Sequence, residues 1–204
     1  MNIVTGMHRS GTSFVAQCLD YLGADFGEPD RFFPADKWNQ QGYLENIDIV
    51  DLNNRAVLGE KAKFDYWMEQ PAQRLERIIN SISSRKWKYF FFPGLDGIYQ
   101  RAMKYATSIE RFSDEYTGKY VKDPRFCLTL RAWLELGEIQ QIVFCFRDPE
   151  SVAGSIRRRE SLPLAFGYRY WLYHVVGFMA QVPDDIPILL VDFDEFFESG
   201  RQHA

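Results

Sequence analysis

Cysteine and histidine are scarce in this 204-residue chain, which contains three of each. The cysteines, Cys18, Cys127 and Cys145, lie in apolar segments and cannot pair completely, which indicates buried thiols in a reducing compartment. The first residues show no signal peptide, so we expect a cytoplasmic protein. No two Cys or His positions stand at the short intervals of a zinc site, and the sequence therefore predicts no structural metal.

A surplus of positive charge is also missing. The chain has 24 Lys and Arg against 28 Asp and Glu, so no general basic field draws it to nucleic acid. Any anionic ligand must then be held by a local cluster. An uninterrupted apolar run is missing too, because the longest apolar stretch, residues 164–182, contains Arg169 and His174. This stretch predicts a packed helix and no membrane span.

Short β-branched or aromatic runs alternate with longer helical stretches along the chain, which is the pattern of an α/β fold with a parallel sheet. The expected strands are residues 2–5, 119–121, 141–146 and 188–191. The expected helices are residues 12–22, 47–58, 71–84, 95–113, 128–136, 149–159 and 164–181. Because the strand candidates are continuous apolar runs, we expect helices on both faces of the sheet, in a three-layer αβα arrangement.

The length of 204 residues suits a single domain, residues 1–204. Its last residues resemble the beginning of a helix that stops early, which favours a domain truncated at the C-terminus. Residues 23–42 are rich in Gly, Pro, Asp and Asn and show no periodicity. A loop of that length inside a compact domain is typical of a lid or a binding loop.

Two glycines, Gly6 and Gly11, frame a loop between the first expected strand and the first expected helix. Glycines let such a loop wrap so that backbone N–H groups point inward, and the following helix adds the positive end of its dipole. Ser10, Thr12 and Ser13 add hydroxyl groups. The combination predicts an anion site, whereas the glycine pair alone would predict only a turn.

The positive charge of this loop lies at Arg9. A nucleoside triphosphate loop reads G-x-x-x-x-G-K-[ST], with the Lys on the terminal phosphates. Thr12 stands at that Lys position here, so the loop is phosphate-binding in form but poorly equipped for magnesium nucleotide chemistry. His8 is open to two interpretations, a donor to a phosphate oxygen or a polar loop side chain without a role.

The run Arg9-Ser10-Gly11-Thr12-Ser13 resembles the 5′-phosphosulfate loop of sulfotransferases that use 3′-phosphoadenosine 5′-phosphosulfate. In that family a basic residue precedes Ser-Gly-Thr-Thr/Ser. The resemblance implies a P-loop NTPase-like sulfotransferase fold. It also implies that Gly6, Arg9, Gly11 and the three hydroxyl residues of the loop bind the donor.

A second match follows the expected strand 141–146, where Arg147-Asp148-Pro149 opens a helix that contains Ser155. An Arg at the carboxyl end of a parallel strand lies at the ligand edge of the sheet, and the Ser can converge with it on one anion. The resemblance implies that Arg147 and Ser155 hold the 3′-phosphate of the donor. Taken alone, Arg147 would equally form a capping ion pair with Asp148 or Glu150.

Two further segments resemble bacterial and carbohydrate-type members of the family, Lys122-Asp123-Pro124-Arg125 and Gly42-Tyr43-Leu44-Glu45-Asn46. The first implies that Lys122 and Arg125 orient cofactor or acceptor, with a salt bridge to Asp123 as the alternative. The second provides Glu45, which is either a general base or a favourable charge at a helix start.

Aromatic residues make up 16% of the chain, which is a high share. Part of this share could provide flat apolar surfaces for adenine or an acceptor. The candidates near the loops or on the aromatic helix are Trp38, Tyr43, Trp67, Tyr168 and Trp171. Most aromatics should nevertheless pack in the core, as the stripe Phe166, Tyr170, Tyr173 and Val176 on the expected helix 164–181 indicates.

The activity implied by the resemblance is in-line transfer of a sulfuryl group to a hydroxyl or amine acceptor, leaving adenosine 3′,5′-bisphosphate. Arg9 and the loop N–H groups would neutralise the developing charge, and Glu45 would take the acceptor proton. His8 is a further catalytic candidate, and Glu28 and Asp36 are alternative bases. No metal is required, and the acceptor is a small molecule, a carbohydrate or a lipid.

Two other functions stay open at this point. A P-loop kinase or NTPase would use Asp192, at the end of the expected strand 188–191, as its magnesium carboxylate, but it lacks the lysine at Thr12. A non-catalytic nucleotide-binding member is the second, because the glycine- and lysine-containing C-terminal loop of many sulfotransferases has no counterpart before Ala204.

Overall fold

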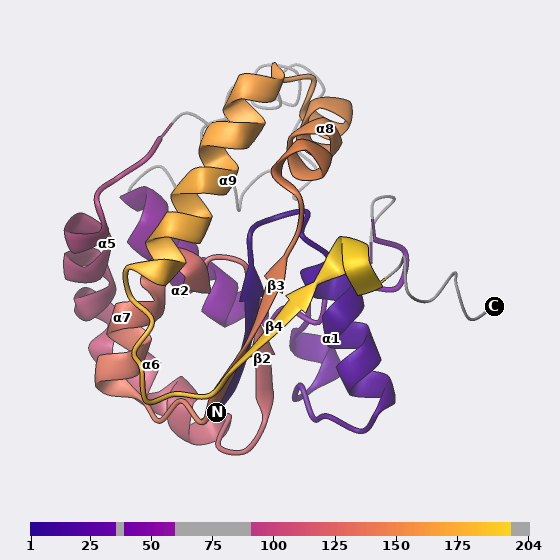
Figure 1. Ribbon diagram of the computed structural model, residues 1–204. Helices are drawn as coiled ribbons and strands as arrows, with labels where there is room; N and C mark the ends of the chain where they lie inside the picture. Colours follow the sequence, from indigo (N-terminus) through magenta and orange to yellow (C-terminus); the bar gives the residue numbers. More distant parts are fainter. Residues whose placement is uncertain (36–38, 60–90, 197–204) are drawn as a thin grey trace, which may run out of the picture.

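The computed structural model describes residues 1–35, 39–59 and 91–196. Its centre is a parallel sheet of four strands in the order β2-β1-β3-β4 (Figure 1). The strands are β1 (Asn2–Gly6), β2 (Tyr120–Lys122), β3 (Gln141–Phe146) and β4 (Ile188–Asp192). The four expected strands are therefore confirmed, with ends displaced by one residue at most.

The helices are α1 (Thr12–Tyr21), α2 (Ile47–Leu58), α5 (Leu95–Ala102), α6 (Ala106–Glu115), α7 (Phe126–Leu136), α8 (Pro149–Glu160) and α9 (Leu164–Met179). Figure 1 shows α1 on one side of the sheet and α2, α5, α6 and α7 on the other. The expected α/β fold with a central parallel sheet flanked by helices is thus confirmed.

The side chains of β3 point alternately to the two faces of the sheet, which explains why helices cover both faces. Ile142 and Phe144 pack into the larger cluster, with α2, α5, α6 and α7, whereas Val143 and Cys145 pack into a smaller cluster with Val15 of α1. Successive side chains of a strand point to opposite faces, so an apolar run supplies two cores at once.

The expected helix 95–113 is divided in the structure. A 3₁₀ turn, Met103–Tyr105, separates α5 from α6, and no Gly or Pro in this turn marks the interruption in the sequence. The expected helix 71–84 lies outside the described residues.

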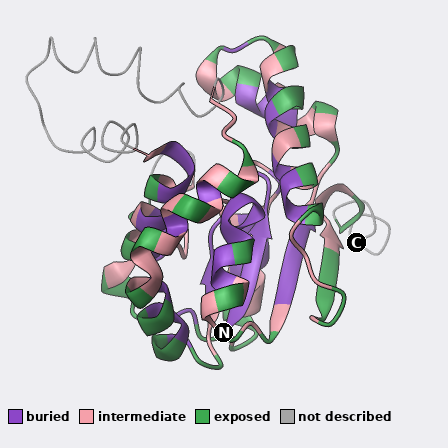
Figure 2. Cartoon of the chain, turned by 90° about the vertical axis from the view of Figure 1, so that its left-hand side faces the viewer, coloured by how far each residue is buried: buried purple, intermediate pink, exposed green. Residues whose placement is uncertain are grey.

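The edge strand β4 differs from the expectation that every strand is covered on both faces. Ile188, Leu189 and Leu190 are 42%, 58% and 63% exposed, because no helix among the described residues packs over them. Figure 2 shows this strand as a largely green arrow beside the purple central strands. Val176 of α9, expected in the core, is 54% exposed as well, so the expected packing stripe is wrong at this residue.

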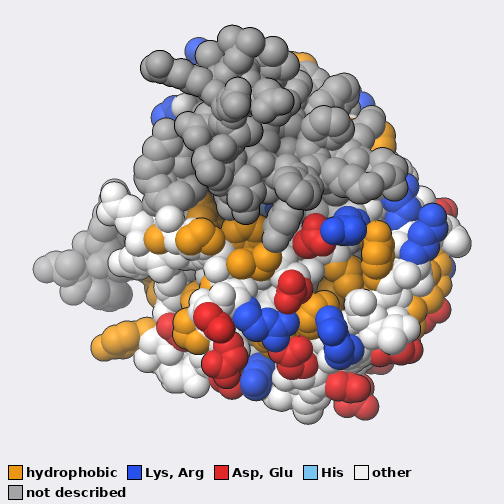
Figure 3. Space-filling model, turned by 180° about the vertical axis from the view of Figure 1, so that it is seen from behind, with side chains coloured by type: hydrophobic (Ala, Val, Ile, Leu, Met, Phe, Trp, Pro, Cys, Tyr) orange, Lys and Arg blue, Asp and Glu red, His pale blue; other side chains and the backbone are white. Residues whose placement is uncertain are grey.

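Charged side chains of both signs are mixed on the surface. On the face seen in Figure 3, Lys and Arg side chains lie interleaved with Asp and Glu side chains over the lower half of the molecule. Such interleaving weakens any long-range field, so an anion must be held by a local arrangement of donors. Among the described helices, none combines the length and apolar character needed to cross a membrane.

Candidate functional site

The loop between β1 and α1 is shaped by its two glycines. Gly6 has a φ of 150°, and a Cβ there would lie 2.2 Å from the carbonyl oxygen of Cys145 on β3. Gly11 has a φ of 83°, and a Cβ there would lie 1.9 Å from Cδ2 of Phe193. Both positions therefore require glycine, for close approach of backbone and ring as well as for conformation.

The start of α1 carries the features of an anion site. Gly11 caps the helix without any side-chain hydrogen bond, and its first turn contains no acidic residue, so the positive end of the helix dipole is not neutralised locally. The hydroxyl of Ser10, in the loop, is buried and has no hydrogen-bond partner within the described residues. Buried hydroxyl groups are normally satisfied, so this arrangement fits a bound oxyanion.

A cavity that we call the loop pocket opens beside this helix start. It holds about 670 Å³ of empty space, part of it open to solvent. Its lining residues are Arg9, Gly11, Thr12, Ser13, Phe14, Gln17, Asn39, Tyr43, Arg147 and Phe193. Two arginines and two hydroxyl side chains therefore meet aromatic rings in one cavity.

Arg9, Arg147 and Ser155 converge although more than a hundred residues separate the first from the others. Arg9 has a left-handed φ of 75°, and its Nε donates to Ser155 Oγ at 3.0 Å. Nη1 of Arg147 donates to the backbone oxygen of Arg9 at 3.3 Å. The structure thus brings together the arginines and the hydroxyl that the sequence assigns to one ligand.

The alternative role of Arg147, an ion pair with Asp148 or Glu150, is not found. Its Nε instead donates to Asp194 Oδ1 at 3.1 Å, and its guanidinium lies 4.8 Å from the ring centre of Phe193. Asp148 caps α8 by accepting from the backbone N–H of Ser151 at 2.7 Å. Arg147 is therefore held between the carboxylate of Asp194 and a ring at the wall of the loop pocket.

Lys122 reaches the loop from the end of β2. Its side chain is fully buried, and its Nζ donates to Ser13 Oγ at 3.1 Å and to Oε1 of Glu45. Lys122 therefore pairs with Glu45 and not with Asp123. The helix-start role considered for Glu45 belongs to its neighbour, since the Asn46 side chain accepts from the N–H groups of Asp48 and Ile49.

Arg125 forms the salt bridge to Asp123 that the sequence offered as an alternative, with Nη1 to Oδ1 at 2.8 Å. Asp123 is fully buried, and its Oδ2 accepts from Nδ2 of Asn53. Burial raises the pKa of Asp123, and the charge of Arg125 opposes that rise. Burial lowers the pKa of Arg125, but the charges of Asp123 and Glu45 more than offset it, so that pKa is raised overall.

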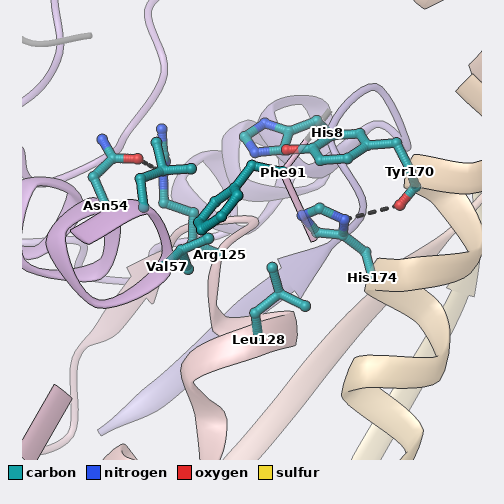
Figure 4. A pocket seen from close by; sticks show the side chains of 9 residues that line it. His8, Asn54, Val57, Phe91, Arg125, Leu128, Tyr170 and His174 are labelled. Carbon is teal, nitrogen blue, oxygen red and sulfur yellow. Dashed lines mark hydrogen bonds between the residues drawn. The ribbon is translucent and has the colours of Figure 1, made fainter. Parts of the chain in front are cut away.

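A second cavity, which we call the α9 pocket, lies on the other side of the loop, among α2, α7 and α9 (Figure 4). It is lined by His8, Asn54, Val57, Leu58, Phe91, Arg125, Leu128, Tyr170 and His174. His8 and Arg125 therefore lie here and do not line the loop pocket. The His8 ring stacks on Tyr170, with ring centres 5.9 Å apart, which orients it toward α9.

Several other expectations have a clear location. Glu28 is exposed and lines neither pocket, and Glu45 lines neither as well. Asp36, Trp38 and Trp67 lie outside the described residues.

Asp192, the magnesium carboxylate of the kinase alternative, is already engaged. Its Oδ1 accepts from the backbone N–H groups of Asp194 and Glu195 at 3.0 and 3.2 Å, so it caps the turn after β4. Within residues 1–35, 39–59 and 91–196, no three His, Cys, Asp or Glu side chains gather as metal ligands would.

Asn53, Asn54, Tyr170, His174 and Phe193 line the two pockets or support them, and sequence reasoning did not select them as site residues. The asparagines are adjacent on α2 but face different partners, Asn53 the buried Asp123 and Asn54 the Arg125 guanidinium. The one available signal was the pair Tyr170 and His174, four residues apart and therefore on one face of a helix.

A scan of the sequence against protein-family models gives no match, and a search of curated proteins finds no significant relative. The candidate function therefore depends on the residues and on the geometry of the two pockets.

Proposed function

We propose that this protein is a sulfotransferase that uses 3′-phosphoadenosine 5′-phosphosulfate and a hydroxyl or amine acceptor. The observation that supports this most is the convergence of Arg9, Arg147 and Ser155 beside the uncapped start of α1. An arrangement with two cations at one end and helix N–H groups at the other suits a nucleotide with two separated anionic groups.

The donor would be held at two places, in the loop pocket and directly beside it. The start of α1, with Ser10, Thr12 and Ser13, would hold the 5′-phosphosulfate. Arg147 and Ser155 would hold the 3′-phosphate, and Arg9 lies against both of these residues. When bound, the donor supplies an electrophilic sulfuryl group whose leaving phosphate gathers negative charge during transfer.

Lys122 and Glu45 would serve the transfer itself. Lys122 places a buried cation on Ser13, next to the helix start where charge would gather, and such fixed charges act strongly in a dry site. The Glu45 carboxylate, held by Lys122, would accept the proton that the acceptor loses. The ion pair thus joins charge stabilisation and proton removal at one position.

The binding experiment measures the affinity of adenosine 3′,5′-bisphosphate and of adenosine 5′-monophosphate by calorimetry. We expect Arg147→Ala to lower the affinity for the bisphosphate by about tenfold or more and the affinity for the monophosphate by less than about threefold. The reason is that only the bisphosphate loses a charge-assisted contact in this variant. Arg131→Ala, which removes an exposed arginine on α7, is the matched control. Equal losses for both nucleotides would remove Arg147 from this role.

The turnover experiment follows transfer of labelled sulfate from the donor to a panel of acceptors. Glu45→Gln should lower turnover by about 10²-fold or more and leave bisphosphate affinity within about threefold. Thermal stabilisation by ATP with magnesium and none by the bisphosphate would favour the kinase alternative and refute the proposal.

A further inference from the structure

Strand β4 lies at one edge of the sheet but has the sequence of a central strand. Among the described strands it pairs only with β3. Ile188 and Leu190 lie on one face of the sheet and Leu189 on the other, and all three are exposed. Apolar side chains on both faces are typical of a strand that is covered on both faces. The composition of β4 therefore predicts further packing against its outer edge.

The outer edge of β4 also carries backbone groups that can bond to another strand. The N–H of Ile142 on β3 donates to the backbone oxygen of Pro187 at 2.9 Å, which fixes the residues of β4 that bond to β3. Since alternate residues bond to each neighbour, the N–H and C=O groups of Ile188 and Leu190 point away from β3. No loop in the described part of the chain bonds to them.

This edge has none of the usual protection against pairing. Exposed edge strands are normally protected by charged residues, by Pro or by a bulge. Residues 188–191 contain neither a charged residue nor Pro, and their register with β3 is unbroken. The edge is therefore open to a further strand.

Helix α9 adds an apolar stripe on the same side of the molecule. The stripe is 38–63% exposed and consists of Tyr168, Leu172, Val176 and Met179. Phe178 of α9 stacks on Phe144 of β3, and Gly177 lies against α7, so the stripe is on the side of α9 that is turned away from α7. In Figure 1 both α9 and β4 lie at the front of the molecule, and in Figure 2 both lie on its right-hand side.

We call the stripe of α9 and residues 188–190 the edge patch. Its seven side chains present on the order of 600 Å² of apolar surface, since a large apolar side chain has roughly 150–200 Å² in total. That is at the upper limit for a patch on a monomer and approaches the surface of about 800 Å² that each partner buries in a specific interface. The one arginine of α9, Arg169, does not interrupt the patch, because its guanidinium lies over the Phe92 ring, 4.5 Å from the ring centre.

The charges around the edge patch favour a second copy of this chain as the partner. Asp184 and Asp185 lie in the turn before β4 and are exposed. Arg157 and Arg158 lie in the last turn of α8, at the opposite end of the molecule, and are exposed too (Figure 1). A two-fold axis at β4 inverts one copy relative to the other, so the acidic end of each copy lies alongside the basic end of its partner.

We propose that β4 and α9 form the interface of a symmetric homodimer. β4 would pair antiparallel with β4 of the second copy and join the two sheets into one. The two-fold axis would stand normal to the joined sheet, which keeps both α9 helices on the same face, where their stripes would meet. In the register that pairs all five residues of β4, Leu190 lies opposite Leu190 of the second copy. This inference does not depend on the function proposed above.

Cysteine cross-linking tests the register. Directly opposite residues of a hydrogen-bonded antiparallel pair have Cα atoms about 5.5 Å apart, which is within the reach of a disulfide. Leu190→Cys, in a chain that also carries Cys18→Ser, should therefore give a disulfide-linked dimer on mild oxidation, seen on a non-reducing gel. Ile188→Cys is the matched control, because its two copies would lie about 13 Å apart along the strands.

Sedimentation of the full chain measures the dimer directly. We expect a dimer at about 50 μM chain, since interfaces of standard size bind at micromolar concentration or more tightly. Leu190→Lys and Val176→Lys should each raise the dissociation constant by about tenfold or more, because each places like charges at the two-fold axis or between the stripes. Both side chains are more than half exposed, so neither change empties the core. Leu22→Lys, at a residue that is 79% exposed after α1, is the matched control.

Three results would overturn this inference. The first is a chain that sediments as a monomer at about 50 μM, the concentration at which micromolar affinity requires a dimer. The second is a dimer that resists both lysine substitutions, or that Leu22→Lys weakens as much as they do, because the interface would then lie elsewhere. The third is cross-linking through residue 188 as efficient as through residue 190, which would contradict the antiparallel register.

Discussion

The ion pair between Lys122 and Glu45 should be strongly cooperative, and this can be measured. The Lys122 side chain is fully buried and that of Glu45 is 13% exposed, so neither charge can be hydrated fully if its partner is removed. Breaking a buried pair costs about 3–5 kcal/mol of folding free energy, and most of that is the penalty for the charge left behind.

The expected losses of folding free energy depend on which charge each variant leaves without its partner. Lys122→Met leaves the slightly exposed Glu45 without its cation, which should cost about 3 kcal/mol. Glu45→Gln keeps an oxygen that can accept from Lys122, so about 2 kcal/mol is expected. The double variant leaves no isolated charge and should lose about 2–3 kcal/mol in total, which gives a coupling free energy of about 2–3 kcal/mol.

The assay is urea unfolding of the four proteins of this cycle, followed by tryptophan fluorescence. The Lys122→Met variant should also melt about 6–12 °C below the parent chain, since about 2–4 °C corresponds to 1 kcal/mol at this size. The exposed pair Arg55 and Asp51 on α2 provides the control cycle, with an expected coupling of about 0.3–0.5 kcal/mol. A coupling at Lys122 and Glu45 as small as the control value would refute the reasoning.

Two further predictions concern the loop and the thiols. Gly11→Ala should abolish bisphosphate binding in calorimetry and lower the melting temperature, because the new Cβ meets the Phe193 ring and the positive φ strains any residue that has a Cβ. Adding Phe193→Ala removes the ring contact but not the strained φ, so the double variant should recover only part of the binding and of the melting temperature. Full recovery of both would contradict this reasoning. Burial raises the pKa of Cys127 and Cys145 to about 12, so a thiol reagent at neutral pH should label Cys18 alone in the native protein, and rapid labelling of a second thiol would contradict it. Since these thiols keep their protons in the folded state, stability should be complete below the usual thiol pKa of 9.0 and fall as the pH rises from 9.0 toward 12, which urea unfolding at each pH would show.

Strands and the loop start were predictable from the sequence for local reasons. Apolar runs such as 141–146 leave little alternative to a strand covered on both faces, and Gly11 followed by two hydroxyl residues marks a helix start. The expectation failed for β4, whose equally apolar run lies at the sheet edge. A strand's neighbours are set by sheet order, which the composition of one strand does not encode.

The site was predictable to the extent that its residues follow strands. Arg147 and Lys122 lie at or just beyond the carboxyl ends of β3 and β2, so their approach to the loop could be expected. The pairing of Lys122 with Glu45 could not be expected from the sequence, because it depends on the path of the chain between residue 42 and α2. The position of His174 in the α9 pocket could not be predicted, because it depends on α9 lying beside the loop, which no local sequence pattern specifies.

The sheet order has a consequence for synthesis on the ribosome. β1 lies between β2 and β3, and its partners on β3 come about 140 residues later in the chain. At about 5–20 residues per second, the strand waits for about 7–28 s before its second neighbour has been made. During that interval its apolar side chains lack their native cover, so chaperone binding to nascent chains shorter than about 140 residues is expected.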